Sequence, residues 1–147
     1  MATGSRDGLT VSQQERLATA LERCRHDNGL DASVLVGDLD VTGPEQFRAG
    51  AEKVHAALGD RSHHAVLIVV APGQRKVEIV TGPAVRRRVP DRVAALAVMS
   101  MVSAFNGGDL TGGILDGLRQ IADSAGKGAP LPPLDAGTGQ VAISAGH

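Results

Sequence analysis

The feature that most constrains the fold is an unbroken apolar run, residues 65–71, which is followed at once by a turn and an alternating segment. A strand with an apolar residue at every position needs both of its faces covered. Pro72-Gly73 is a turn signal. Polar and apolar residues then alternate over 76–81, with Lys76 and Glu78 on one side. This pattern predicts a second strand with one solvent-exposed face. We therefore expect a β-hairpin whose first strand is covered on both sides.

The rest of the chain supplies one more strand and four helices. A capping-box pattern from Ser12 to Glu15 opens the first helix, and the first strand is a second apolar run. In chain order we expect a helix over about 12–26, a strand over 32–37, a helix over 44–58, the hairpin, and helices over about 90–105 and 109–125. The β-α-β portion makes the first two strands parallel through a right-handed crossover, and the hairpin adds an antiparallel third strand. The predicted fold class is α/β, a three-layer α/β/α sandwich with a small mixed sheet.

The length of 147 residues fits one domain with a substantial core. We expect residues 1–10 to be disordered and residues 11–126 to form the domain. Residues 127–147 are rich in Gly and Pro, which predicts a flexible tail. Whether residues 141–143 add a short strand is left open by the sequence.

Composition narrows the classes of partner. The chain has 15 basic and 16 acidic residues, so no general attraction to nucleic acid or to an anionic membrane is expected. Phe47 and Phe105 are too few aromatic residues for a platform on which bases stack. The longest apolar stretch, residues 93–105, falls short of the ~20 residues needed to cross a bilayer, and the first residues lack the apolar core of a signal peptide. We expect a cytoplasmic protein.

Signals for catalysis are sparse. The sequence contains no G-x-S-x-G, H-E-x-x-H or P-loop pattern. Cys24 is the single cysteine, which excludes an intramolecular disulfide and a cysteine metal cluster, and we interpret it as a small hydrophobe on a helix face. Whether the chain is an enzyme stays open at this point, and no catalytic residue is assigned.

A candidate cation site follows from the predicted topology. Asp38 and Asp40 come just after the first strand, and a third helix that packs back along the sheet would bring Asn106 and Asp109 to the same edge. Ligands of open α/β sheets bind at the carboxyl ends of parallel strands. Carboxylates there would suit Ca²⁺ or Mg²⁺. The same residues also fit ordinary roles, Asp109 as a helix N-cap and the other two in a turn, and these roles are favoured because no calcium-loop spacing is present.

A second candidate site lies at the opposite edge of the predicted sheet. Arg86, Arg87 and Arg88 follow the hairpin and could hold a phosphate or an acidic partner. A solvated charged patch is the simpler interpretation. Glycines also surround Asp109, and a Gly-rich loop before a helix can bind an anion, but this aspartate would repel one. We interpret these glycines as sites where the start of the last helix packs closely against the sheet.

Two segments resemble the TPM domain, a family whose best-known member is a thylakoid-lumen acid phosphatase. They are AVLIVVAPGQRKVEIVTG at 65–82 and FNGGDLTGGILDGL at 105–118, and weaker similarity covers roughly 32–125. The second segment matches the family ending F-x-x-G-D-(aromatic)-x-x-G-(apolar)-x-x-G-(apolar) at Gly108, Asp109, Gly113 and Gly117. The chain is most similar to short, uncharacterised actinobacterial members. The resemblance implies an α/β/α sandwich.

The resemblance also shows departures. Residues 82–86 read Gly-Pro-Ala-Val-Arg where typical members have G-Y-G-L-E, and Leu110 stands where the family has an aromatic residue. TPM domains are variously proposed to be phosphatases, divalent-cation binders or interaction modules. Any site that uses the missing tyrosine and glutamate is not expected here.

Three functional hypotheses follow. The first is a non-catalytic binding module whose ligand is a protein partner or a divalent cation. The second is a divalent-metal-assisted phosphatase, an activity that the resemblance implies. It would use the three aspartates of the candidate cation site, because such an enzyme needs a cation to polarise the phosphoryl group. The third is a structural module that forms a homodimer through the apolar helix at 93–105.

Overall fold

The computed structural model describes residues 9–37, 39, 43–131 and 141–143. The elements in chain order are α1 (Val11–Arg23), the π-helical turn η2 (Cys24–Asn28), β1 (Asp31–Val36), α2 (Pro44–Ala56), the 3₁₀ turn η3 (Gly59–His64), β2 (Ala65–Ala71), the 3₁₀ turn η4 (Pro72–Gln74), β3 (Lys76–Thr81), α3 (Asp91–Asn106), α4 (Leu110–Ala125) and β4 (Val141–Ile143).

The four strands form one mixed sheet in the order β3-β2-β1-β4. β1 pairs in parallel with β2, and β2 pairs antiparallel with β3, as the hairpin and the crossover predict. β4 pairs in parallel with the other side of β1, with Val34 opposite Val141 and Val36 opposite Ile143. The strand that the sequence left open therefore forms within the segment predicted as a tail.

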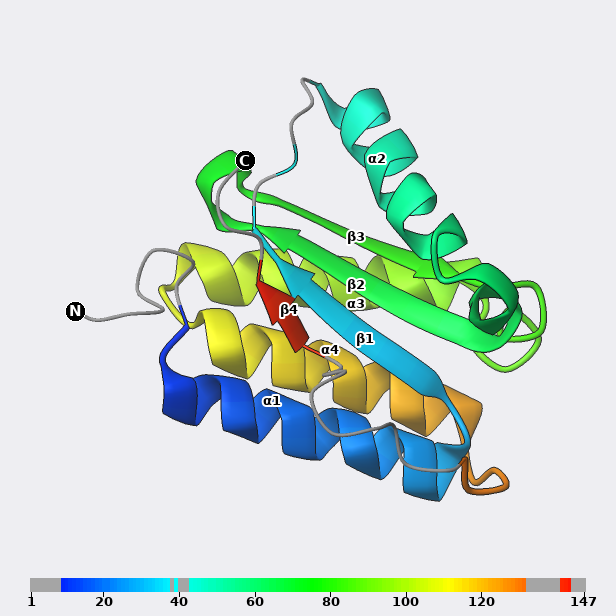
Figure 1. Ribbon diagram of the computed structural model, residues 1–147. Helices are drawn as coiled ribbons and strands as arrows, with labels where there is room; N and C mark the ends of the chain where they lie inside the picture. Colours follow the sequence, from blue (N-terminus) through cyan, green and yellow to red (C-terminus); the bar gives the residue numbers. More distant parts are fainter. Residues whose placement is uncertain (1–8, 38, 40–42, 132–140, 144–147) are drawn as a thin grey trace.

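The sheet has helices on both faces, which confirms the α/β fold class. Figure 1 shows α1, α3 and α4 below one face and α2 alone above the other. All seven residues of β2 are buried, as its unbroken apolar run requires. Among the helices that the structure describes, none combines the length and hydropathy needed to cross a bilayer.

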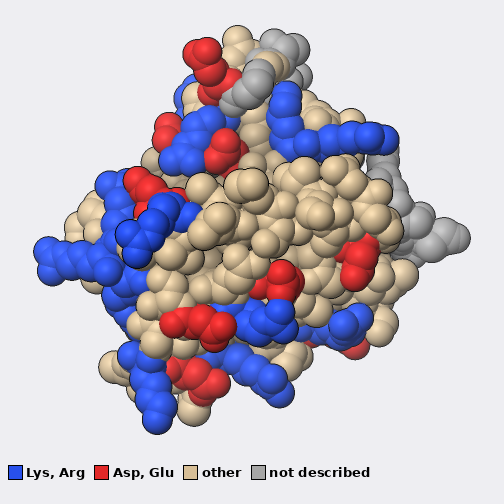
Figure 2. Space-filling view, turned by 180° about the vertical axis from the view of Figure 1, so that it is seen from behind, with Lys and Arg blue, Asp and Glu red and all other residues tan. Residues whose placement is uncertain are grey.

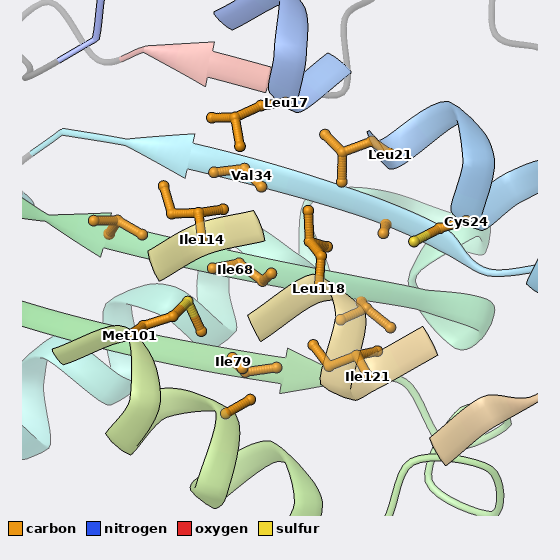
Figure 3. Packing of buried hydrophobic residues seen from close by; sticks show 14 of the residues in the cluster. Leu17, Leu21, Cys24, Val34, Ile68, Ile79, Met101, Ile114, Leu118 and Ile121 are labelled. Carbon is orange, nitrogen blue, oxygen red and sulfur yellow. The ribbon is translucent and has the colours of Figure 1, made fainter. Parts of the chain in front are cut away.

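The main core lies between the three-helix layer and the sheet. Leu17 and Leu21 of α1, Met101 of α3, and Ile114 and Leu118 of α4 point at the strands, as Figure 3 shows. A smaller core on the other face packs α2 against the sheet through Phe47, Ala51, Leu67, Val69, Ala71 and Val80. The two cores together fix the hairpin and both α3 and α4 relative to β1.

The first helix begins earlier than the sequence pattern predicts. Its capping box is formed by Thr10 and Gln13, not by Ser12 and Glu15: Gln13 N donates to Thr10 Oγ1 at 3.1 Å, and Thr10 N donates to Gln13 Oε1 at 2.8 Å. Leu9 is fully buried in the main core. Residues 9 and 10 thus belong to the folded domain, while the rest of the segment predicted to be disordered, 1–8, lies outside the described residues.

Gly113 and Gly117 of α4 pack against α3, whereas the sequence predicted that the glycines beside Asp109, Gly113 among them, pack against the sheet. A Cβ atom on Gly113 would lie 2.9 Å from Ala104 Cβ and from the ring of Phe105, and one on Gly117 would lie 2.9 Å from the methyl carbon of Met101. The two glycines are one helical turn apart, so they open one face of α4 to the neighbouring helix. The close approach of α3 and α4 fixes the turn between them.

Cys24 gives a testable consequence of core burial. It is 4% exposed in the main core (Figure 3), and burial, followed by the charge of Asp27, raises the pKa of its thiol from 9.0 to about 11. The folded state therefore keeps the proton to higher pH than the unfolded chain. The stability that this group contributes is fully present below pH 9.0 and is lost as the pH rises toward 11.

We expect the free energy of unfolding, measured by urea titration at a series of pH values, to fall across this interval. A Cys24→Val variant should lack the part of the decline that comes from the thiol. Identical pH dependence in the two proteins would contradict the assignment.

Candidate binding site at the carboxyl edge of the sheet

The turn between α3 and α4 places Asp109 at one end of the sheet. Gly108 has φ 87°, a left-handed conformation that favours glycine, and the Gly108 N–H donates to Phe105 O at 2.9 Å. Asp109 is the N-cap of α4: its Oδ1 accepts from Gly112 N at 2.9 Å. A Cβ atom on Gly112 would collide with the Asp109 carboxylate, so this glycine makes room for the cap. The capping role that the sequence favoured for Asp109 is confirmed.

The segment after β1 reaches the same end of the sheet. Leu39 exchanges two hydrogen bonds with the side chain of Gln74 in the β2–β3 turn: Leu39 N donates to Oε1 at 3.1 Å, and Nε2 donates to Leu39 O at 3.0 Å. Gly37 N donates to Val70 O at 2.8 Å. The predicted ligands Asp38 and Asp40, on either side of Leu39, lie outside the described residues.

A cleft of about 670 Å³ opens between these turns. Its walls come from the β2–β3 turn, the end of α3 and the α3–α4 turn: Pro72, Arg75, Val102, Phe105, Asn106, Gly108 and Leu110. Asp109 stands between two of the lining residues in sequence. The third helix therefore does return the chain to the carboxyl edge of β2, as the predicted topology requires. The cleft combines apolar walls with one guanidinium and one amide.

Arg75 lines the cleft, and sequence reasoning did not single it out. It is exposed, and it has φ 55° and ψ 44°, the left-handed region that non-glycine residues rarely adopt. Its backbone N–H closes the turn on Pro72 O at 3.2 Å. The Pro72-Gly73 turn signal pointed to this place but did not reveal that the fourth turn residue faces the cleft. Such local strain recurs at binding sites.

The charged groups of the described residues are spread out. Among them no group of three or more His, Cys, Asp or Glu side chains gathers in a way that could hold a metal ion. Of the three predicted cation ligands, Asp109 alone is described, so the proposed Ca²⁺ or Mg²⁺ site stays a prediction.

At the opposite edge, the three consecutive arginines have separate surroundings. Arg86 donates to Thr81 O at 3.2 Å. Arg88 donates through Nη2 to Asn28 O at 2.6 Å and to Ala125 O at 3.2 Å, and so binds the ends of η2 and α4. Arg87 is exposed. Arg88 thus satisfies carbonyl groups that a helix end leaves open, and a role for the three arginines in binding an anion stays a prediction.

A buried ion-pair cluster also lies at this edge, and sequence reasoning missed it. Asp31, the first residue of β1, accepts from Arg25 at 2.9 Å and from Arg61 at 2.9 and 3.0 Å. Arg25 and Asp31 are buried, and the hydrogen bond to Asp31 raises the pKa of Arg61. The sequence offered one signal for this cluster: Asp31 stands directly before an apolar run, where a carboxylate needs a partner. This cluster holds the start of β1 against η2 and η3.

Solved structures of other proteins share the fold. The BA42 protein from the psychrophilic bacterium Bizionia argentinensis matches with a TM-score of 0.72 and 14% identity, over 93% of this chain and 96% of that chain. The N-terminal domain of a P. gingivalis protein matches with a TM-score of 0.68 and 18% identity, over 80% and 77% of the two chains. The N-terminal domain of the cg2496 protein from Corynebacterium glutamicum gives 0.64 and 16%, over 88% and 82%. At these identities the likeness shows the fold alone.

Sequence comparison adds relatives of unknown role. Two uncharacterized proteins of Mycobacterium tuberculosis are each 35% identical over 65 residues, which is 44% of this chain and 39% of the relative. The match thus spans well under half the length of those relatives. A family model described as a domain of unknown function, DUF5130, matches residues 5–122.

Proposed function

Since the chain belongs to the DUF5130 family, whose function is unknown, we propose from its own geometry that it is a non-catalytic binding module. The observation that carries this proposal is the cleft of about 670 Å³ at the carboxyl edge of the sheet. Its volume falls in the range of ligand sites, and its walls are mostly apolar with few polar groups. Two turns and one helix end supply those walls, so the site exists only in the folded domain.

The finer part of the proposal concerns the ligand. Apolar side chains from α3 and α4 beside the Arg75 guanidinium suit a protein segment that carries an apolar residue and a carboxylate. A divalent cation held by Asp38, Asp40 and Asp109 is the other ligand that the sequence favours. The resemblance to the TPM domain supports both, because binding roles have been proposed in that family. A cytoplasmic location is part of this proposal.

Two substitutions at Asp109 separate ligand binding from helix capping. Asparagine caps a helix as well as aspartate does, so Asp109→Asn should change the free energy of unfolding by less than about 0.5 kcal/mol, whereas Asp109→Ala should lower it by about 1 kcal/mol. If Asp109 is a cation ligand, both variants lose affinity for Ca²⁺ or Mg²⁺. Backbone amide shifts during metal titration measure the affinity, and urea unfolding measures the stability.

The cation version fails if millimolar Ca²⁺ or Mg²⁺ shifts no amide near Asp109 in the unaltered protein. The cleft would still be open to a protein segment, which an Arg75→Gln variant tests separately. That variant should weaken capture of a peptide ending in an apolar residue and a free carboxylate, and leave metal-induced shifts unchanged. Equal peptide affinity in the two proteins would show that the Arg75 guanidinium does not contribute to peptide binding.

Arg75 also gives one reason to keep the phosphatase hypothesis as a second candidate. A guanidinium beside the Asp109 turn could hold a phosphoryl group, while the aspartates would hold the metal ion that polarises it. Purified protein should then release phosphate from a small aryl phosphate only when Mg²⁺ or Ca²⁺ is present. Absence of metal-dependent release, or release that survives Asp109→Ala, would reject this candidate.

A further inference from the structure

α3 presents an exposed stripe along its whole length. Its members are Arg92, Leu96, Met99, Ser103 and Asn106, and all of them are exposed. Their spacing alternates between four and three residues, so they lie along one face of the helix, and the two residues at its middle, Leu96 and Met99, are apolar. Leu96 is 57% exposed and Met99 is 66% exposed, the largest apolar exposures on this helix.

The stripe crosses a surface without charge. No residue between Arg92 and Asp109 is charged in the sequence. Figure 2 looks at the face on which α3 lies, and it shows an uncharged band across the middle with basic and acidic side chains at its margins. An exposed apolar face framed by charge in this way is typical of a protein interface.

We propose that a second copy of this chain covers the stripe, with its α3 antiparallel to the first. Charge complementarity between the two ends of the stripe favours this arrangement. Arg92 lies at the start of the stripe, and Asp109 lies one turn beyond its end. A twofold axis at Met99 places Arg92 beside Asn106 of the second copy, within reach of Asp109 of that copy. The contact occurs twice, because a twofold interface is self-complementary.

The shape of the surface beside the stripe supports the same arrangement. A hollow of about 470 Å³ lies between α3 and β3. Its apolar walls are Ala94, Ala95, Val98 and Met99 of the helix with Val77 and Ile79 of the strand, and the charged residues Arg48, Glu78 and Asp91 complete the lining. An apolar side chain from an antiparallel helix can enter this hollow as a knob enters a hole. Met99 stands at its rim, so Met99 of the second copy lies next to it when the axis passes there.

The open edge of β3 is a poorer place for the second copy. Gly82 N donates to Ala65 O, so the alternate residues Ile79 and Thr81 direct their carbonyl groups away from β2. Arg48 donates to Ile79 O at 3.3 Å, and Arg86 donates to Thr81 O at 3.2 Å. Charged side chains that occupy edge carbonyls oppose strand-to-strand pairing. The helix face is therefore the assigned contact.

The decisive experiment measures the mass of the full chain by light scattering and sedimentation over a range of concentrations. The unaltered protein should form a dimer. Met99→Glu should raise the dimer dissociation constant at least about thirtyfold, because the new charge is buried at the centre of the interface in both copies. Val11→Glu is the matched control: Val11 is 63% exposed on α1, away from α3, so this variant should dimerise normally.

A second pair of variants tests the orientation. The Arg92→Glu substitution places a negative charge opposite Asp109 of the second copy. It should raise the dimer dissociation constant about tenfold. Asp109→Asn keeps the helix cap, and in the Arg92→Glu background it should restore most of that loss. A monomer at every concentration overturns the proposal, and so does a dimer that Met99→Glu leaves intact. Failure of Asp109→Asn to restore affinity overturns the antiparallel arrangement.

The proposed dimer contact meets the cleft at Asn106 and Asp109, and the variant at the centre of the contact separates the two proposals. Met99 does not line the cleft, so Met99→Glu should leave metal-induced and peptide-induced shifts unchanged. A protein that dimerises but binds no ligand, or binds a ligand as a monomer, separates the two proposals.

Discussion

Asp31→Asn is expected to lower the free energy of unfolding by about 3–5 kcal/mol. The Asp31 carboxylate accepts from Arg25 at 2.9 Å and from two nitrogens of Arg61. Arg25 and Asp31 are buried, so the substitution removes a negative charge that faces a buried guanidinium. The loss is larger than for an exposed ion pair because buried charges are screened much less than charges in water. Urea unfolding followed by circular dichroism measures it.

A matched substitution at an exposed ion pair provides the control. Glu78 bonds to Arg48 at 2.7 Å, but Arg48 is 47% exposed, so Glu78→Gln should cost less than about 1 kcal/mol. Adding Arg25→Met to Asp31→Asn should recover part of the loss, because it removes the buried charge. If Asp31→Asn destabilises no more than Glu78→Gln, the cluster does not hold β1 in place.

Gly82→Ala is expected to destabilise the domain by about 3 kcal/mol, the upper end of the usual range for over-packing. A Cβ atom on Gly82 would collide with the carbonyl oxygens of Ser62 and His63. These are backbone atoms, so no side-chain rotation can relieve the contact. The segments are also tied together, since Gly82 N donates to Ala65 O at 2.9 Å and Ala84 N donates to His63 O at 3.1 Å. Thermal and urea unfolding both report the effect.

Gly107→Ala is the control for that substitution. At Gly107 the nearest atom to an added Cβ is Ala104 O at 3.5 Å, and φ is −87°, a conformation open to any residue. This variant should be neutral or more stable by up to about 1 kcal/mol, because alanine restricts the unfolded chain. Similar losses at positions 82 and 107 would mean that general glycine effects, and not the collision, decide stability.

The parts of the fold that follow from hydrophobic periodicity could be predicted. The apolar run at 65–71 predicted a fully covered strand, and β2 is buried at every residue. The β-α-β order and the hairpin turn then determined the parallel and antiparallel pairings. These features depend on many residues at once, so a single misread residue does not alter them.

The errors concern single side chains whose partners are distant or ambiguous. Both Ser12 and Thr10 can cap a helix, and the burial of Leu9 in the core selects Thr10. The glycines of α4 needed a close neighbour, but the sequence does not name it, and the side chains of α3 take that place. Arg88 resembled part of a solvated run, yet its guanidinium binds carbonyls at Asn28 and Ala125.

The position of the candidate site could be predicted from the sequence, but most of the side chains that line it could not. The order of elements indicated that the α3–α4 turn returns to the carboxyl edge, and the cleft forms there between Arg75, Phe105 and Leu110. Asp109 was correctly assigned as an N-cap. Arg75 could not be found from a charge pattern, because its role depends on an unusual backbone conformation in a turn.

The pairing of β4 with β1 has a consequence for synthesis of the chain. Val36 and its partner Ile143 are more than a hundred residues apart, and α2, β2, β3, α3 and α4 are all made between them. The edge of β1 that pairs with β4 therefore has no partner strand until β4 has left the ribosome. During that interval the nascent sheet offers a template on which a neighbouring chain could misassemble.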